Sequence, residues 1–318
     1  MQQAETISGV LLSSTMDLKS FYALDRANSG DRVRLFDPGE VPDPASIRFA
    51  VCWLPEDDAF TPYPNLEMAM SVGAGVDALL GNPSLGEDAL ICRVRDPHQA
   101  DLMAGYAAHE TLHFLRSFRQ LKDQQDARIW KPLAMTPPAE TRIAVLGNGT
   151  MGAAIARTLA AMGFSVAVAC RTEPGEPQAG VSYHSGADAV AAACRGSRIA
   201  INVLPLTAET ENILNNRLFS QLEPGAWLIQ IGRGEHLDEA DFAAALDSGQ
   251  LAGASLDVFR EEPLPEHHPF WRDERLRITP HIASDSTPRV VAEQIRACAD
   301  ELLRGKRPRL AIDRRQGY

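Results

Sequence analysis

The 318-residue chain lacks the long apolar runs and the basic excess that mark membrane and nucleic-acid-binding proteins. No apolar stretch approaches the roughly 18 residues that span a bilayer. The 31 Lys and Arg residues are outnumbered by 42 Asp and Glu residues, which gives a formal net charge of −11. We therefore expect no membrane and no nucleic acid as a partner, because both are anionic and attract basic proteins. An acidic protein that binds an anion needs local positive charge, so individual arginines become informative.

Cysteine is also scarce and shows no redox or metal-binding spacing. None of the five cysteines forms a C-x-x-C pair, so we expect buried, reduced thiols. His109 and His113 are spaced i, i+4, but no third ligand is evident, and we expect no metal site. The first residues, MQQAETISGVLLSS, lack a basic region followed by a long apolar segment. We expect no signal peptide and a cytoplasmic location.

Residues 142–171 carry the most informative motif. An apolar run of strand length precedes three glycines, and a helical run follows within a unit of about 30 residues. The first glycine permits a tight turn, the second lets backbone approach a pyrophosphate, and the third lets the helix pack against the strand. The helix N-terminus offers N–H groups to phosphates. The motif predicts a dinucleotide site in the loop Gly147, Asn148, Gly149, Thr150, Met151 and Gly152.

Strand-like and helical segments alternate along the chain. The candidate strands are residues 10–13, 33–36, 49–53, 68–72, 90–94, 142–146, 165–170, 198–204, 226–231, 252–258 and 276–279. The candidate helices are residues 17–27, 96–125, 188–194, 238–246 and 287–303. Strands that alternate with helices predict right-handed crossovers and parallel sheets covered on both faces.

We therefore predict an α/β protein with two domains. A Rossmann-type doubly wound parallel sheet forms the NAD(P)-binding domain over residues 99–285, which includes the long linking helix. A smaller α/β domain is predicted from residues 1–98 and 286–318. A length above 300 residues agrees with two domains.

Ligands of parallel sheets bind beyond the carboxyl ends of the strands, where several charged residues occur. Arg171 ends the second strand of the glycine unit, and an arginine there suits the 2′-phosphate of NADP. Thr172 adds a hydroxyl donor, whereas Glu173 opposes the phosphate as a like charge. We expect NADPH to be preferred over NADH.

Other strand ends supply further candidates. Leu204 and Pro205 lie in a loop predicted to form a wall of the cofactor cleft. Arg233 lies between two glycines, which leaves its cation open to an anionic ligand. His281 follows a strand and a proline, and histidine is the usual proton donor when a carboxylate orients it. Residues 71–77, SVGAGVD, are interpreted either as an anion-binding turn or as a glycine turn that only joins a strand to a helix.

The combination of GNGTMG, IGRGE, LDVFREEPLP with HPFW, and TPHIAS resembles the D-isomer-specific 2-hydroxyacid dehydrogenase family from about residue 50 to the C-terminus. SVGAGVD, Trp53, the IWKPL stretch and the RRQGY end resemble its glyoxylate/hydroxypyruvate reductase A branch. The resemblance implies that Arg233 binds the substrate carboxylate and that His281 donates a proton. It also implies that Glu262 holds the imidazole and favours its protonated form.

The resemblance also implies that the smaller domain, residues 1–98 and 286–318, is flavodoxin-like and binds the substrate. Substrate contacts are implied for Trp53, Gly73, Ala74, Gly75 and Val76, and for Trp130 in the site of the partner subunit. Cofactor contacts are implied for Ile231, Gly232, His281 and Asp257, the last with the nicotinamide carboxamide.

We expect a homodimeric, NADPH-dependent reductase that transfers a hydride to a short 2-oxo acid, glyoxylate or hydroxypyruvate. Two alternatives stay open. One is an NAD-dependent dehydrogenase for a larger or phosphorylated 2-hydroxy acid. The other is a non-catalytic NAD(P)-sensing protein on the same fold. The sequence does not set the size of the pocket, so it does not choose among the 2-oxo acids.

Overall fold

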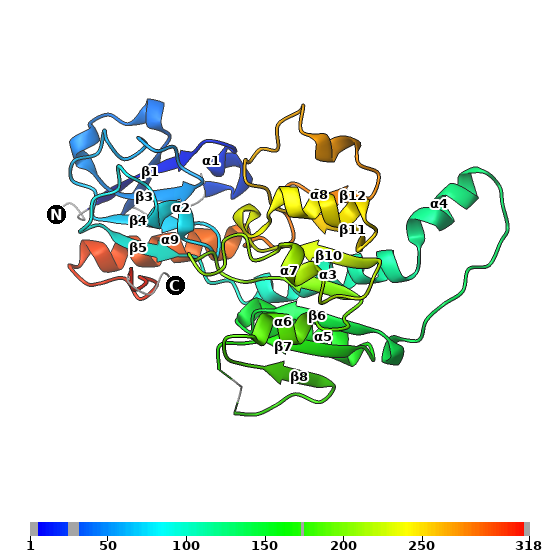
Figure 1. Ribbon diagram of the computed structural model, residues 1–318. Coiled ribbons are helices and arrows are strands. Elements are labelled where there is room, and N and C mark those ends of the chain that lie inside the picture. The colour runs from blue at the N-terminus through cyan, green and yellow to red at the C-terminus, as the bar shows by residue number, and fades with distance from the viewer. Residues whose placement is uncertain (1–5, 25–31, 173–174, 315–318) are drawn as a thin grey trace. The chain divides into compact units, whose positions relative to one another are not determined.

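The computed structural model in Figure 1 describes residues 6–24, 32–172 and 175–314. The chain divides into two compact units, residues 1–98 with 285–318, and residues 99–284. No helix in these described ranges is long and apolar enough to cross a membrane.

The first unit contains a five-stranded parallel sheet in the order β2-β1-β3-β4-β5, which is the flavodoxin-like order. Its strands are β1 (Ile7–Ser13), β2 (Val33–Phe36), β3 (Ile47–Trp53), β4 (Met68–Ser71) and β5 (Leu90–Arg93). Its helices are α1 (Leu18–Phe21), η2 (Pro38–Glu40), η3 (Pro44–Ser46), α2 (Asp77–Leu80) and α9 (Pro288–Leu303). Helix α9 packs its apolar face into one core of this unit, and α2 contributes Leu79 to the other.

The second unit contains a seven-stranded parallel sheet in the order β12-β11-β10-β9-β6-β7-β8. Its strands are β6 (Arg142–Leu146), β7 (Ser165–Ala169), β8 (Val181–His184), β9 (Ile199–Asn202), β10 (Ala226–Gln230), β11 (Leu251–Leu256) and β12 (Leu276–Ile278). From β8 to β11 this is the Rossmann order, extended by one strand. The predicted fold class is confirmed.

Helices cover both faces of this larger sheet. Its helices are α3 (His98–Leu115), α4 (Phe118–Asp126), η4 (Pro138–Glu140), α5 (Thr150–Ala161), α6 (Ala189–Cys194), α7 (Asn216–Phe219), η5 (Gly234–His236), α8 (Glu239–Asp247) and η6 (Pro269–Arg272). Helices α3 and α5 pack on one face, and α6, α7 and α8 pack on the other. Strands buried on two faces must be apolar along their whole length, which is why they read as continuous apolar runs in the sequence.

The helix predicted over residues 96–125 is wrong in one respect, because the chain breaks it in two. Ser117 adopts a left-handed conformation with φ of 50°, and the following helix α4 buries none of its residues. Packing therefore does not require α4 to continue the axis of α3. The segment from α4 to η4 extends away from the sheet of its own unit (Figure 1).

Two smaller predictions also need correction. The helix expected over residues 17–27 is a single turn, α1, which ends before Ala23 turns to a φ of 50°; residues 25–27 lie outside the described residues. Strand β8 was not predicted, because as an edge strand it is only partly buried and lacks a continuous apolar run.

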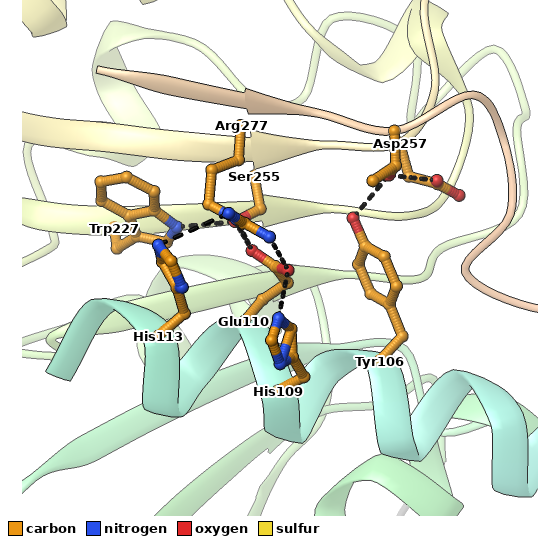
Figure 2. Close-up of polar contacts among 9 residues, drawn as sticks. Tyr106, His109, Glu110, His113, Trp227, Ser255, Asp257 and Arg277 are labelled. Carbon is orange, nitrogen blue, oxygen red and sulfur yellow. Dashed lines mark hydrogen bonds and ion pairs between the residues drawn. The ribbon is translucent and has the colours of Figure 1, made fainter. Parts of the chain in front are cut away.

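An ion pair with a buried carboxylate fixes α3 to the sheet (Figure 2). Glu110, whose side chain is 2% exposed, accepts two hydrogen bonds from Arg277 of β12 at 2.8 and 3.1 Å. It also accepts one from Ser255 of β11 at 2.5 Å, and Trp227 donates to the same serine hydroxyl at 3.0 Å. Burial opposes ionisation of Glu110, but the bonds from Arg277 and Ser255 outweigh burial and hold its pKa below the ordinary value.

Replacing Glu110 is therefore expected to destabilise the fold in a pH-dependent way. Glu110→Gln should lower the free energy of unfolding at pH 7 by about 2 kcal/mol, because the Arg277 cation loses its buried partner. Since the folded pKa lies below the unfolded value, the stabilisation is present above pH 4.5 and is lost as pH falls through the folded pKa. Urea unfolding at neutral and acidic pH measures the effect, with the exposed Glu140→Gln as the control. Equal losses at both pH values would contradict the assignment.

Candidate active site

The glycine loop joins β6 to α5, and its three glycines meet different demands. Gly147 has a φ of 113°, which side chains rarely adopt. A Cβ atom on Gly152 would overlap the carbonyl group of Gly147. A Cβ atom on Gly149 would meet nothing within 4 Å. The fold requires the first and third glycines, whereas the second leaves open space, as the close approach of a pyrophosphate needs.

The start of α5 fits the same ligand. Gly149 is its N-cap residue, no side chain caps the helix, and its first turn contains no acidic residue. Its N–H groups and the helix dipole therefore suit an anion. Asn148, Thr150 and Met151 are partly or fully exposed beside it. The residues present fit the diphosphate of a dinucleotide.

Arg171 and Thr172 lie just beyond β7, after the buried Cys170, and are exposed. A hydrogen bond from Thr207 holds the pKa of Glu209 below its ordinary value, and the positive charge of Arg171 contributes to this shift. Arg171, which is predicted to bind the 2′-phosphate of NADP, therefore lies near the loop that contains Leu204, Pro205 and Glu209. Glu173 lies outside the described residues.

A buried polar cluster, which the sequence interpretation missed, supports the strand ends next to this loop. Asn202 donates to Gln230 at 2.8 Å and lies 3.0 Å from Nδ1 of His236. The backbone N–H of Arg233 also donates to that Nδ1 at 3.0 Å, so Nδ1 is the acceptor and Nε2 carries the proton toward the Pro205 carbonyl. The only hint in the sequence is that polar residues end the apolar strands β9 and β10.

This cluster positions the backbone of Arg233. Gln230 donates to the Arg233 carbonyl at 2.8 Å, and the Arg233 guanidinium donates to the Gly232 carbonyl at 2.8 Å. A Cβ atom on Gly234 would overlap the backbone of Phe259, so this glycine allows two chain segments to touch. Ile231 and Gly232 precede the arginine and are buried.

His281 and Glu262 form the second charged element. Nδ1 of His281 lies 2.8 Å from Oε2 of Glu262, and the two side chains are 21% and 17% exposed. The other oxygen of Glu262 accepts the Phe259 N–H at 2.9 Å. The carboxylate is therefore held at both ends, and it holds the imidazole in turn.

Asp257 lies beneath the same loop and is 1% exposed. Oδ1 accepts the Ile282 N–H and Oδ2 accepts the Ala283 N–H, both at 2.9 Å. Burial raises the pKa of Asp257, and the hydrogen bonds offset part of that rise. Both carboxylate oxygens already have donors from the chain, and the contact with a nicotinamide carboxamide stays a prediction.

The predicted substrate residues of the first unit form a compact turn. A Cβ atom on Gly73 would lie 2.7 Å from the Trp53 ring, so the indole covers this glycine. Arg93 donates to the Ala74 carbonyl at 2.9 Å, and Gly75 and Val76 complete the turn before α2. Trp130, in the second unit, is 98% exposed and has no hydrogen-bond or ring partner within the described part of the chain.

His109 and His113 lie beside the ion pair between Glu110 and Arg277. His109 lies 3.5 Å from Glu110, and His113 lies 3.5 Å from the Arg277 guanidinium. Burial and the Arg277 charge lower the pKa of His113. No group of three or more metal-ligating side chains occurs among residues 6–24, 32–172 and 175–314.

The strand order, the glycine loop and the histidine–glutamate pair define a dinucleotide-dependent oxidoreductase of the doubly wound class. A family model described as "D-isomer specific 2-hydroxyacid dehydrogenase, NAD binding domain" matches residues 109–283. The chain belongs to the D-isomer-specific 2-hydroxyacid dehydrogenase family, as its motifs predicted.

Its relatives also confirm the branch. A glyoxylate/hydroxypyruvate reductase A of Serratia proteamaculans is 38% identical over 292 residues, 90% of this chain and 92% of the relative. The enzyme of the same name from Salmonella typhi is 35% identical over 93% of this chain and 95% of its own length.

Two solved structures are similar over nearly the whole chain. One is a D-isomer specific 2-hydroxyacid dehydrogenase of Xanthobacter autotrophicus Py2 in complex with NADPH and MES, with a TM-score of 0.85, 35% identity and coverage of 99% and 100%. The other is an NADPH-dependent glyoxylate/hydroxypyruvate reductase of Sinorhizobium meliloti in complex with NADP and sulfate, with a TM-score of 0.87, 30% identity and coverage of 98% and 100%.

The different demands on the glycines give a test of the loop. Gly149→Ala is expected to weaken NADPH binding roughly tenfold, because the methyl group enters the space left for the pyrophosphate. The free energy of unfolding should change by less than about 1 kcal/mol. Gly152→Ala should instead lower that free energy by about 2 kcal/mol through overlap with Gly147. Fluorescence titration and chemical unfolding measure both quantities. Wild-type affinity in Gly149→Ala would refute the proposed phosphate site.

Proposed function

We propose that the chain is an NADPH-dependent reductase that converts a short 2-oxo acid, glyoxylate or hydroxypyruvate, to the 2-hydroxy acid. The observation that carries the proposal is the 2.8 Å contact between His281 and Glu262. This pair lies at the carboxyl edge of a dinucleotide-binding sheet that also presents Arg233. The names of the relatives support the same substrates.

His281 acts as the proton donor in this proposal. Because Nδ1 bonds to the Glu262 carboxylate, Nδ1 keeps its proton, and Nε2 is the nitrogen that exchanges one. The imidazolium gives the Nε2 proton to the keto oxygen as that oxygen becomes a hydroxyl. The Glu262 carboxylate fixes the ring and stabilises its positive charge. The reduced nicotinamide, when bound, supplies the hydride that forms the new C–H bond.

Arg233 supplies the positive charge that an acidic protein needs for an anionic substrate. Its guanidinium can bind the substrate carboxylate with two parallel hydrogen bonds and can polarise the keto group. The buried cluster of Asn202, Gln230 and His236 fixes the backbone from which the guanidinium extends. Reduction then needs little rearrangement of the site as charge develops on oxygen.

We propose a preference for NADPH over NADH, because Arg171 follows β7 where a guanidinium suits a 2′-phosphate. The substrate contacts of Trp53 and of the Gly73–Val76 turn stay predictions, and so does the cytoplasmic location, which cell fractionation tests. Those contacts determine the size of the substrate pocket and therefore which 2-oxo acid fits it best.

We also propose that the chain forms a homodimer through the segment from α4 to η4. Four large apolar side chains on this segment are exposed: Phe118 46%, Ile129 54%, Trp130 98% and Met135 48%. Several large apolar side chains exposed on one segment are typical of a protein interface. A second copy of the chain is the proposed occupant, with Trp130 contributing to its site.

Sedimentation equilibrium tests the dimer. We expect twice the chain mass for the wild type and a shift toward the monomer for Trp130→Ala, because truncating an aromatic anchor commonly costs about 2 kcal/mol or more of binding energy. The control is Trp271→Ala, because Trp271 is exposed and its indole donates to the carbonyl of nearby Pro265, whereas Trp227 donates to the buried Ser255 of β11. A wild-type monomer at micromolar concentration would disprove the dimer.

Purified enzyme tests the proposed reaction. We expect glyoxylate and hydroxypyruvate to drive oxidation of NADPH with a higher kcat/KM than NADH supports. His281→Ala should reduce kcat by roughly 100-fold or more, because a general acid is lost, while NADPH binding survives. Turnover only with NADH and bulkier 2-oxo acids would indicate the NAD-dependent alternative. NADPH binding without turnover would indicate a cofactor sensor.

A further inference from the structure

The backbone that carries His281 is strained and must be held by its surroundings. His281 has a φ of 55°, a left-handed conformation that costs a non-glycine residue about 1 kcal/mol or more. Asp257 holds this residue and the two residues that follow it. Its carbonyl accepts the His281 N–H at 2.9 Å, and its carboxylate accepts the N–H groups of Ile282 and Ala283 at the same distance.

The Asp257 carboxylate is the end of a chain of hydroxyl groups that begins on α3 (Figure 2). Thr279 donates to Oδ1 of Asp257 at 2.5 Å, and the Tyr106 hydroxyl lies 2.7 Å from the Thr279 hydroxyl. Thr279 has one proton, which it gives to the carboxylate, so it accepts from Tyr106. The direction of the chain is therefore Tyr106 to Thr279 to Asp257.

The helix that carries Tyr106 is itself fixed to the same two strands. Glu110 lies one turn after Tyr106 and bonds to Ser255 and Arg277. Ser255 precedes Asp257 by two residues, and Arg277 precedes Thr279 by two residues, so each pair of residues points to the same side of its strand. Helix α3 therefore bonds to this edge of the sheet at two successive turns. Glu110 bonds to Ser255 and Arg277 within the strands, and Tyr106 bonds to Thr279 just beyond β12. The bonds of Glu110 therefore fix the position of the Tyr106 hydroxyl relative to the loop that contains His281.

We propose that Tyr106 is a positioning residue for the reaction, acting through Thr279 and Asp257 on the backbone of His281. The proposal rests on the proposed function, in which His281 donates the proton. The tyrosine does not touch the reacting atoms. It fixes the rotamer of Thr279, which restricts the carboxylate that holds the strained loop. Displacing a catalytic group by a fraction of an ångström is enough to reduce turnover.

Tyr106→Phe removes only the hydroxyl group and keeps the ring in its place. We expect kcat for glyoxylate to fall roughly tenfold, because the imidazole is less well aligned with the keto oxygen. The KM and Kd for NADPH should stay at wild-type values, because the glycine loop is unchanged.

A second pair of variants separates positioning from general stability. Thr279→Val should reproduce the tenfold loss, and Thr279→Ser, which keeps the hydroxyl, should restore turnover to near the wild-type value. The double variant Tyr106→Phe/Thr279→Val should be no slower than Thr279→Val alone, because both changes break one chain. Tyr183→Phe is the matched control; its hydroxyl has no hydrogen-bond partner among the described residues, and we expect wild-type kcat.

The outcomes that overturn the proposal are specific. If Tyr106→Phe has the same kcat as Tyr183→Phe, the proposal fails. Additive losses of kcat in the double variant would also overturn it. A fall in kcat accompanied by equal weakening of NADPH binding would indicate general damage to the unit. His281→Ala separates the two levels of inference. If it keeps full turnover, the proposed function fails with the inference; if it abolishes turnover while Tyr106→Phe does not alter kcat, only the inference fails.

Discussion

The parallel direction of the strands is the constraint on which the candidate site depends. In the larger sheet every strand runs the same way, so the carboxyl ends of neighbouring strands meet at one edge. Residues more than 130 positions apart, from the glycine loop to His281, therefore share that edge. The central strands β6, β9 and β10 are buried on both faces, so their side chains pack in the core and the polar side chains that follow them are left for chemistry. The fold supplies a rigid apolar base, and the first residues beyond it carry the function.

This division explains which features could be predicted from the sequence. Apolar runs predicted nearly all the strands. Charged or titratable residues close to the ends of those runs predicted Arg171, Arg233 and His281 as site residues. Both signals are local and need no knowledge of the partner strand. The break at Ser117 and the edge strand β8 were missed for a related reason. No glycine or proline lies beside Ser117, and β8, although Gly180 precedes it, is short and has no continuous apolar run.

The buried polar clusters could not be predicted, although each of their residues is visible in the sequence. Asn202, Gln230 and His236 bond to one another only because β9 and β10 pair in one register, with Asn202 opposite Gln230. Tyr106 and Thr279 are 173 positions apart and meet only after α3 has packed on the sheet. A polar residue in an apolar segment indicates that a partner must exist, because an unpaired buried polar group is costly. The identity of that partner is a property of the tertiary structure.

Three local rules are broken close to the candidate site, and the breaks are related. His281 adopts a left-handed backbone conformation, Asp257 is a buried carboxylate, and Glu110 is a second buried carboxylate on the adjoining helix. Each feature alone would destabilise the fold. Together they are compensated, since Asp257 accepts bonds from the strained loop and Glu110 fixes the helix that supports Asp257. A site that must hold a proton donor in one orientation needs directional bonds, and apolar packing, which has no direction, cannot provide them. The buried charges are thus best understood as the means by which an apolar α/β core orients a histidine at its edge.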